Sequence, residues 1–192
     1  MRTKEQPNES AHPIRGGDSP ATRSPEDLFA VMTETVATMV SRDLDHAGKT
    51  GGSTMESITD TAEQAFHGAL DVGGDVGLAA KGVLVGVVRG SRVTGDAALQ
   101  MADRVCRTLI RRTASAGAEV GLAATGLVQG ALVAAKDLGL DSATAASVTA
   151  HAAGEAAEEF GADVVREVRV SLAGTIDGLN VLIKEPLQKR SP

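Results

Sequence analysis

The chain has 192 residues, a net charge of −6 at neutral pH, and three aromatic residues, all phenylalanine. This length fits one domain plus a tail and is enough to bury a core. The acidic balance and the lack of stacking aromatics disfavour a nucleic-acid-binding protein, so no nucleic acid partner is expected.

The sequence also bears on where the protein acts. A single cysteine, Cys106, excludes an internal disulfide and is typical of a reducing compartment. The N-terminal segment lacks the apolar stretch of a secretory signal. No apolar run reaches the roughly 18 residues of a membrane-spanning helix. We therefore expect a cytoplasmic protein.

The first predicted helix follows a polar segment. Residues 1–23 contain three prolines and no apolar periodicity, which predicts a disordered N-terminal tail. Ser24 and Pro25, followed by two acidic residues, have the composition of a helix start. Apolar residues at helical spacing then continue to Leu44, so a short helix is predicted over 24–45. Residues 187–192 are expected to be a C-terminal tail.

The rest of the chain repeats with a period of 44 residues. The segment GGDVGLAAKGVLVGVVRG, residues 73–90, returns as GAEVGLAATGLVQGALVAA from Gly117, and a fainter third copy begins at Gly161. Glycines at 51, 95 and 139, each followed by a capping residue, mark the unit boundaries. The predicted repeats are 52–95, 96–139 and 140–183, within one helical-repeat bundle over 24–186.

An apolar stripe runs through each unit at alternating spacings of three and four residues. We call it the core stripe; in the first two units it consists of Met55, Ile58, Ala62, Ala65, Ala69, Val72, Val76, Ala80 and Val83, and of Leu99, Ala102, Cys106, Leu109, Thr113, Ala116, Val120, Ala124 and Leu127. An 11-residue period keeps apolar residues on one face of a nearly straight helix, and 44 residues are four such periods. The core stripe therefore favours an unbroken helix of about 40 residues per unit.

This interpretation predicts an all-α fold, an elongated antiparallel helical bundle. Three long helices run up, down and up, and the shorter N-terminal helix packs beside them. An alternative is one helical hairpin per unit, as in solenoids of similar period. This alternative needs a break in the middle of each unit. Gly73 provides a suitable residue in the first unit, but the equivalent segments of the other two, SAGAEVG and EEFGADVV, have the composition of poor turns. A strand over 83–88 is disfavoured because the equivalent residues in the other units do not alternate between apolar and polar as a strand would.

Glycines inside the predicted helices are the main candidate interaction residues. They recur at intervals of four, although each costs about 1 kcal/mol relative to alanine. Such strips allow two backbones to approach closely. We favour packing of the repeats against one another, and a docking surface for another copy, a partner helix or lipid is the alternative. The helix-packing glycines are Gly82, Gly86, Gly90, Gly126, Gly130, Gly174 and Gly178.

Two histidines have carboxylates at helical spacing, which raises the question of a metal site. His67 follows Glu63 by four residues, and His151 precedes Glu155 by four, with Glu158 and Glu159 a turn later. Carboxylate-bridged metal sites in bundles use Glu-x-x-His instead. Solvated ion pairs are therefore favoured, and no metal or cofactor is expected.

A basic stripe of Arg104, Arg107, Arg111 and Arg112 is predicted on the second long helix. Antiparallel pairing about Gly95 would place Arg111 and Arg112 near Asp71 and Asp75, giving interhelical ion pairs; an anion-binding surface is the alternative. Cys106 belongs to the core stripe and is expected to be a buried, inert thiol.

No nucleophile–base arrangement, phosphate-binding loop or Cys/His metal pattern is present in the sequence. We therefore expect a non-enzymatic scaffold or interaction protein that forms a homo-oligomer or binds partner protein helices through its Gly/Ala-rich faces. In period and alanine content, residues 52–183 resemble the class of repetitive amphipathic-helix proteins, including granule-coating phasins, apolipoprotein-like and late-embryogenesis-type sequences. That resemblance implies an alternative, binding to a membrane or lipid surface by insertion of residues 120–135.

Overall fold

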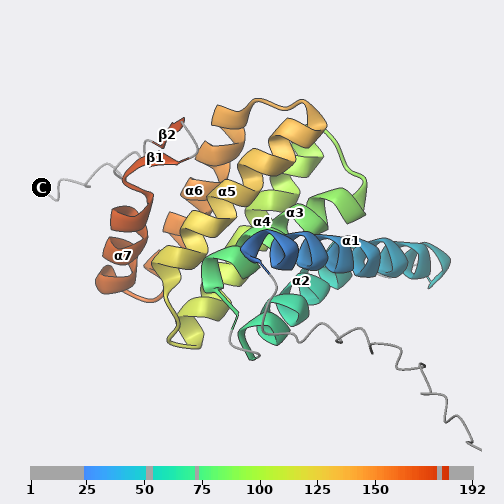
Figure 1. The fold of residues 1–192 in the computed structure, drawn as a ribbon, viewed down its shortest axis with the longest axis horizontal. Coiled ribbons are helices and arrows are strands. Elements are labelled where there is room, and N and C mark those ends of the chain that lie inside the picture. Colours follow the sequence, from blue (N-terminus) through green and yellow to red (C-terminus); the bar gives the residue numbers. More distant parts are fainter. Residues whose placement is uncertain (1–23, 51–53, 72–73, 177–178, 182–192) are drawn as a thin grey trace, which may run out of the picture.

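The structure, a computed structural model, describes residues 24–50, 54–71, 74–176 and 179–181. The tails predicted over 1–23 and 187–192, and Gly178, lie outside these residues. The elements are α1 (Pro25–Thr50), α2 (Thr54–Asp71), α3 (Val76–Ser91), α4 (Asp96–Ser115), α5 (Val120–Leu138), α6 (Ser142–Glu158), α7 (Ala162–Leu172), β1 (Gly174–Ile176) and β2 (Leu179–Val181). The predicted all-α class is confirmed, with one short β-hairpin added near the C-terminus (Figure 1).

The helix predicted over 24–45 begins as expected and extends further. The backbone N–H of Asp27 donates to Ser24 Oγ (3.1 Å), and the N–H of Ser24 donates to Asp27 Oδ2 (3.2 Å). This reciprocal pair satisfies helix-end donors in the manner of a capping box. The helix continues to Thr50 because an isolated glycine such as Gly48 weakens a helix without ending it.

The prediction of unbroken long helices is wrong. Helix α4 ends at Ser115 and α5 begins at Val120, with Gly117 between them at a φ of +66°. The N–H of Gly117 donates to Ala114 O and that of Ala118 to Thr113 O, both at 3.1 Å. These two bonds form a Schellman motif, in which glycine adopts the left-handed conformation that ends a helix.

The other two units break in the same place. Helix α2 ends at Asp71 and α3 begins at Val76, while α6 ends at Glu158 and α7 begins at Ala162. Asp75 supports the restart of the chain, since its carboxylate accepts from the backbone N–H of Leu78 (2.7 Å). Each predicted unit therefore contains two helices, as the hairpin alternative expected, rather than one.

The up–down–up arrangement is also wrong, because helices at corresponding places run parallel. Along α3, Gly82 lies opposite Met32 of α1, and Gly90 lies opposite Ala37 and Val40 further along α1. The odd-numbered helices α1, α3 and α5 pack side by side with α7 at the end, and α4 packs between α2 and α6 (Figure 1). The fold is thus two layers of helices rather than a bundle of three long ones.

Helix α3 lies at the centre of the core. From Ala79 to Ser91 all its residues are buried except Lys81, which is half-buried, and Arg89, which is exposed. It packs against α1 and α5 within its layer and against α2 and α4. A helix that is apolar on every side is expected where neighbours surround it. Residues 83–88 are helical, so the disfavoured strand is absent.

Gly174, from the third set of predicted helix-packing glycines, differs from the glycines of the first two sets. Gly174 begins β1 at a φ of +121° and pairs with Val181 of β2 in the antiparallel hairpin. It is therefore not a helix-packing glycine, in contrast to the prediction. Helix α7 ends at Leu172, before the position where the glycine strip would continue.

Candidate functional site

The glycines of α3 and α5 lie in contacts between helices of this chain. A Cβ atom placed on Gly86 would lie 2.7 Å from both Thr33 O and Val36 Cβ of α1. On Gly126 it would overlap the backbone carbonyl of Gly77, and on Gly130 it would lie 2.9 Å from Lys81 O. These strips are therefore filled by neighbouring helices of the same molecule.

Ion pairs connect the helices of the other layer. Arg107 Nη2 lies 2.5 Å from Glu155 Oε2 and Arg111 Nη2 lies 2.5 Å from Glu159 Oε1, both from α4 to α6. Arg107 also pairs with Asp103 on its own helix (2.9 Å). We call these three pairs the α4–α6 ladder. The expected interhelical pairing is present, but with partners other than those predicted.

The predicted partners of Arg111 and Arg112, Asp71 and Asp75, are wrong, and Arg111 pairs with Glu159 at the end of α6. Arg112 instead lies 3.6 Å from Glu63 of α2. Asp71 pairs with His67 (2.7 Å). Arg104 is exposed and lines a shallow hollow with Asp103 and Val148.

The remaining predicted polar residues are solvated pairs. His151 Nε2 lies 3.1 Å from Glu155 Oε1, as the spacing indicated, whereas His67 contacts Asp71 rather than Glu63. Glu158 is exposed. In the described part of the chain, no three His, Cys, Asp or Glu side chains are arranged to hold a metal ion.

Hydrogen bonds and burial shift the pKa values of several side chains on α4 and α6. The Arg107 guanidinium holds the pKa of Glu155 below its usual value, and Arg111 does the same for Glu159. Hydrogen bonding to Asp103 raises the pKa of Arg107. Burial raises the pKa of the Cys106 thiol, which donates to Thr149 O (3.3 Å). Cys106 is therefore a buried, protonated thiol, as expected.

The ladder predicts a specific dependence of stability on pH. Because the pKa values of Glu155 and Glu159 lie below their value of 4.5 in the unfolded chain, their stabilising contribution is present above that value and is lost as the pH falls below it. We expect the double variant Glu155→Gln/Glu159→Gln to have a urea midpoint that falls less steeply than that of wild type between about pH 6 and 3. Glu158→Gln is the control, since Glu158 forms no ion pair with any described residue. Equal slopes for all three proteins would contradict a stabilising ladder.

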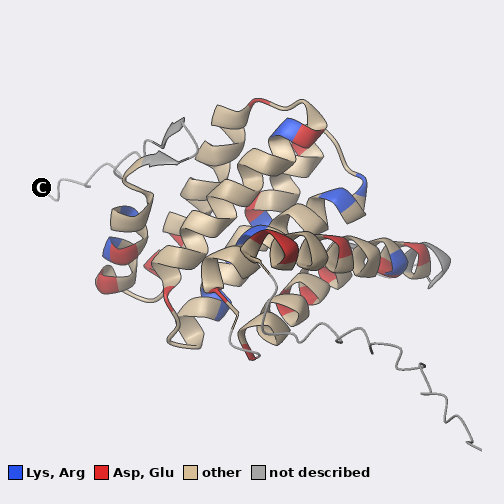
Figure 2. Cartoon of the chain, viewed as in Figure 1, with Lys and Arg blue, Asp and Glu red and all other residues tan. Residues whose placement is uncertain are grey.

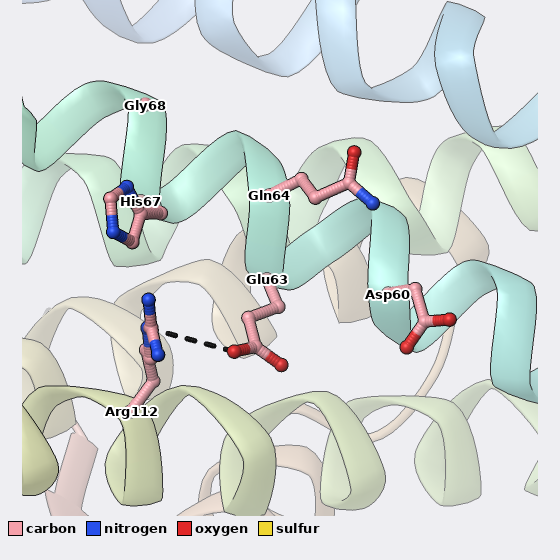
Figure 3. A pocket seen from close by; sticks show the side chains of 6 residues that line it. All are labelled: Asp60, Glu63, Gln64, His67, Gly68 and Arg112. Atoms are coloured by element: carbon pink, nitrogen blue, oxygen red, sulfur yellow. Dashed lines mark ion pairs between the residues drawn. The ribbon is translucent and has the colours of Figure 1, made fainter.

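One polar hollow lies between α2 and α4 (Figure 3). Asp60, Glu63, Gln64 and His67 reach it from α2, and Arg112 reaches it from α4. An ion pair joins Arg112 and Glu63 at this hollow, so these two charges offset each other (Figure 3). Its side chains are half-buried or exposed.

A second hollow is more apolar and spans three helices. We call it the leucine groove: it is bordered by Leu28 of α1, Leu78 and Lys81 of α3, and Leu122, Thr125 and Gln129 of α5. Leu28 and Leu122 are each 45% exposed. Pro25 and Asp75 also border the groove, which has a volume of about 450 Å³.

Sequence reasoning missed this groove, although a signal was present. Leu78 and Leu122 occupy equivalent positions of the two strong copies and lie outside the core stripe. Apolar residues outside the core stripe are not part of the core that the stripe predicts. In Figure 2, α5 shows charged residues only at its C-terminal end, where Lys136 and Asp137 lie, so the groove side of this helix is uncharged.

The segment considered for lipid insertion, residues 120–135, forms most of α5. Nearly all its residues are buried against neighbouring helices, with Leu122 exposed. Among the described residues, no helix combines the length and the apolar character that crossing a membrane requires. Comparison with protein-family models, curated proteins and solved structures finds no match to this chain.

Proposed function

We propose that this protein is a non-enzymatic helical scaffold that self-associates, and that can bind partner helices through the same surface. The observation that supports this proposal most directly is the leucine groove. Two of the five large apolar side chains exposed in the described structure, Leu28 and Leu122, border it, and a third, Val31, lies one turn from Leu28. Apolar side chains that gather at a groove are typical of a protein–protein contact.

The energetics favour a protein ligand for this surface. Covering apolar area stabilises a complex by about 25 cal/mol per Å². In helices α4 and α6 of the other layer, by contrast, charged groups form ion pairs within their own chain. We place the protein in a reducing compartment such as the cytoplasm, where the protonated Cys106 thiol needs no partner.

We further infer that the scaffold is a stack of helical hairpins in a 44-residue frame, with α1 as an additional half unit. The contacts of Gly86 with Thr33 O and Val36 Cβ recur at Gly130 with Lys81 O and Leu84 Cβ. Gly86 and Gly130 are 44 positions apart in the sequence, whereas the residues that they contact are 48 positions apart. Helix α1 therefore takes the place of an earlier α3.

This correspondence assigns a role to the free side of α1. A shift of 48 places Glu34, Thr38 and Arg42 where α3 has Gly82, Gly86 and Gly90, and all three are exposed. Terminal elements of stacked repeats need such a polar outer face to stay soluble. Helix α1 thus closes the stack at its N-terminal end.

Sedimentation velocity of the purified wild-type protein tests self-association. Over about 1 to 100 µM, the range in which a modest interface is half-saturated, we expect the sedimentation coefficient to rise toward that of one discrete oligomer. Flotation with neutral or anionic liposomes should leave the protein in the dense fraction. A monomer at every concentration would contradict self-association, and robust flotation would favour the lipid-binding alternative.

A further inference from the structure

We propose that the leucine groove is a two-fold interface, in which a second copy of this chain docks the same groove. This inference rests on the proposed self-association and names its surface and partner. The apolar centre comes from Leu28 and Leu122, which lie on different helices and are each 45% exposed. Joining two such surfaces removes four half-exposed leucines from water.

The charges at the groove indicate a second copy as the occupant. Lys81 and Asp75, both near the start of α3, border the groove. An isologous interface brings a surface against itself, so it needs both signs of charge at its edge. A two-fold axis between these residues places Lys81 of each copy opposite Asp75 of its partner.

Both charged groups are available for such a contact. Lys81 Nζ lies 5.0 Å from the centroid of the Phe29 ring and forms no ion pair with any residue that the structure describes. Asp75 is exposed, and Oδ1 is the oxygen that accepts from Leu78 N–H. Its carboxylate therefore keeps an oxygen for a partner's ammonium group.

The two-fold arrangement agrees with the polar end of the stack. Glu34 and Arg42 on the free side of α1 oppose end-to-end addition of another helix layer. Heterologous end-to-end contacts generate open filaments, whereas a two-fold contact closes at two copies. The expected assembly is a dimer, and higher concentration should not extend it.

Leu122→Lys is the first test, measured by sedimentation equilibrium. It places two additional cations at the centre of the interface, and we expect the dimer to dissociate at least about tenfold more readily. Val170→Lys is the matched control, because Val170 is 69% exposed and lies on α7, outside the groove. An unchanged dissociation constant in Leu122→Lys, or an equal weakening in both variants, overturns the proposal.

Charge exchange provides a second test that uses the geometry itself. Lys81→Glu sets a carboxylate against the partner's Asp75 in a homodimer, and Asp75→Lys sets lysine against lysine, so each variant should be monomeric. Mixed together, the two variants have opposite charges at both contacts and should form a heterodimer. Circular dichroism verifies the fold of Asp75→Lys, which loses the cap of α3. If that variant unfolds, Lys81→Glu and Leu122→Lys still decide the outcome.

The results separate this inference from the broader function. If wild type dimerises and the groove variants dimerise equally well, the interface lies elsewhere while self-association stands. If wild type is monomeric, both proposals fail. Flotation of wild type with vesicles of phosphatidylcholine and phosphatidylserine, lost in Leu122→Lys, would overturn the second copy as occupant in favour of lipid.

Discussion

The variant Gly126→Ala is expected to destabilise the protein by about 3 kcal/mol, at the upper end of the cost of overpacking a core. Alanine has the higher helix propensity, by about 1 kcal/mol, so propensity alone predicts the opposite sign. The new Cβ would overlap the carbonyl oxygen of Gly77, which is backbone and has no alternative rotamer. Helices α3 and α5 would have to separate, and contacts along both would weaken. Urea unfolding followed by circular dichroism measures the change.

Two glycines in other helices provide matched controls. Gly68 of α2 and Gly154 of α6 have open space where a Cβ would lie, with nothing within 4 Å. Gly68→Ala and Gly154→Ala should therefore stabilise the protein by about 0.5–1 kcal/mol, because alanine loses less backbone entropy on folding. One chemical change then has opposite signs at different positions. A stabilising Gly126→Ala would show that glycine does not set the distance between α3 and α5.

Local patterns predicted several helix ends and much of the core. Ser24 and Pro25 marked the start of α1, and Gly95 and Gly139 marked boundaries between helices. Core-stripe residues such as Ala62, Val83, Leu109 and Leu127 are buried. These features depend on 3.6-residue periodicity and on caps, which act within a few residues, so the chain alone carries them.

The helix breaks could have been predicted but were not. Gly117 and Gly161 lie at equivalent repeat positions, and both have a positive φ. A Schellman motif needs one such residue and two hydrogen bonds, so SAGAEVG is a sufficient turn despite its modest composition. The core stripe continues across the break because both helices of a hairpin face one core. Its continuity is therefore weak evidence for a single long helix.

The ion pairs and the groove depend on which helices become neighbours. Arg111 pairs with Glu159, 48 residues away, because α4 and α6 lie side by side. Helical spacing carries no information on that choice. Leu122 becomes part of a groove only when α1 packs against α3 and α3 against α5. The signal available in the sequence was that Leu122 is an apolar residue outside the core stripe.

Among truncations of the described residues, Phe66→Ala should have the largest effect, about 3–5 kcal/mol. Phe66 on α2 is fully buried and is the largest fully buried side chain of the described core. Such a loss is a large share of the 5–15 kcal/mol that stabilises an ordinary domain. We expect the urea midpoint to fall sharply, and the variant to be partly unfolded at physiological temperature.

The reason for so large an effect lies in the composition of the core. This core is built mainly from alanine and valine, with helices α1, α3 and α5 packed close at glycines. Short side chains on closely packed backbones cannot reach into the space that a phenyl ring leaves, so the cavity stays open and its full cost is retained. Phe160→Ala is the control: Phe160 is 38% exposed at the turn before α7, and its loss should cost under about 1 kcal/mol. Similar midpoints for the two variants would mean that the α2 side of the core collapses around the missing ring, contrary to the rigid packing inferred from the glycine contacts.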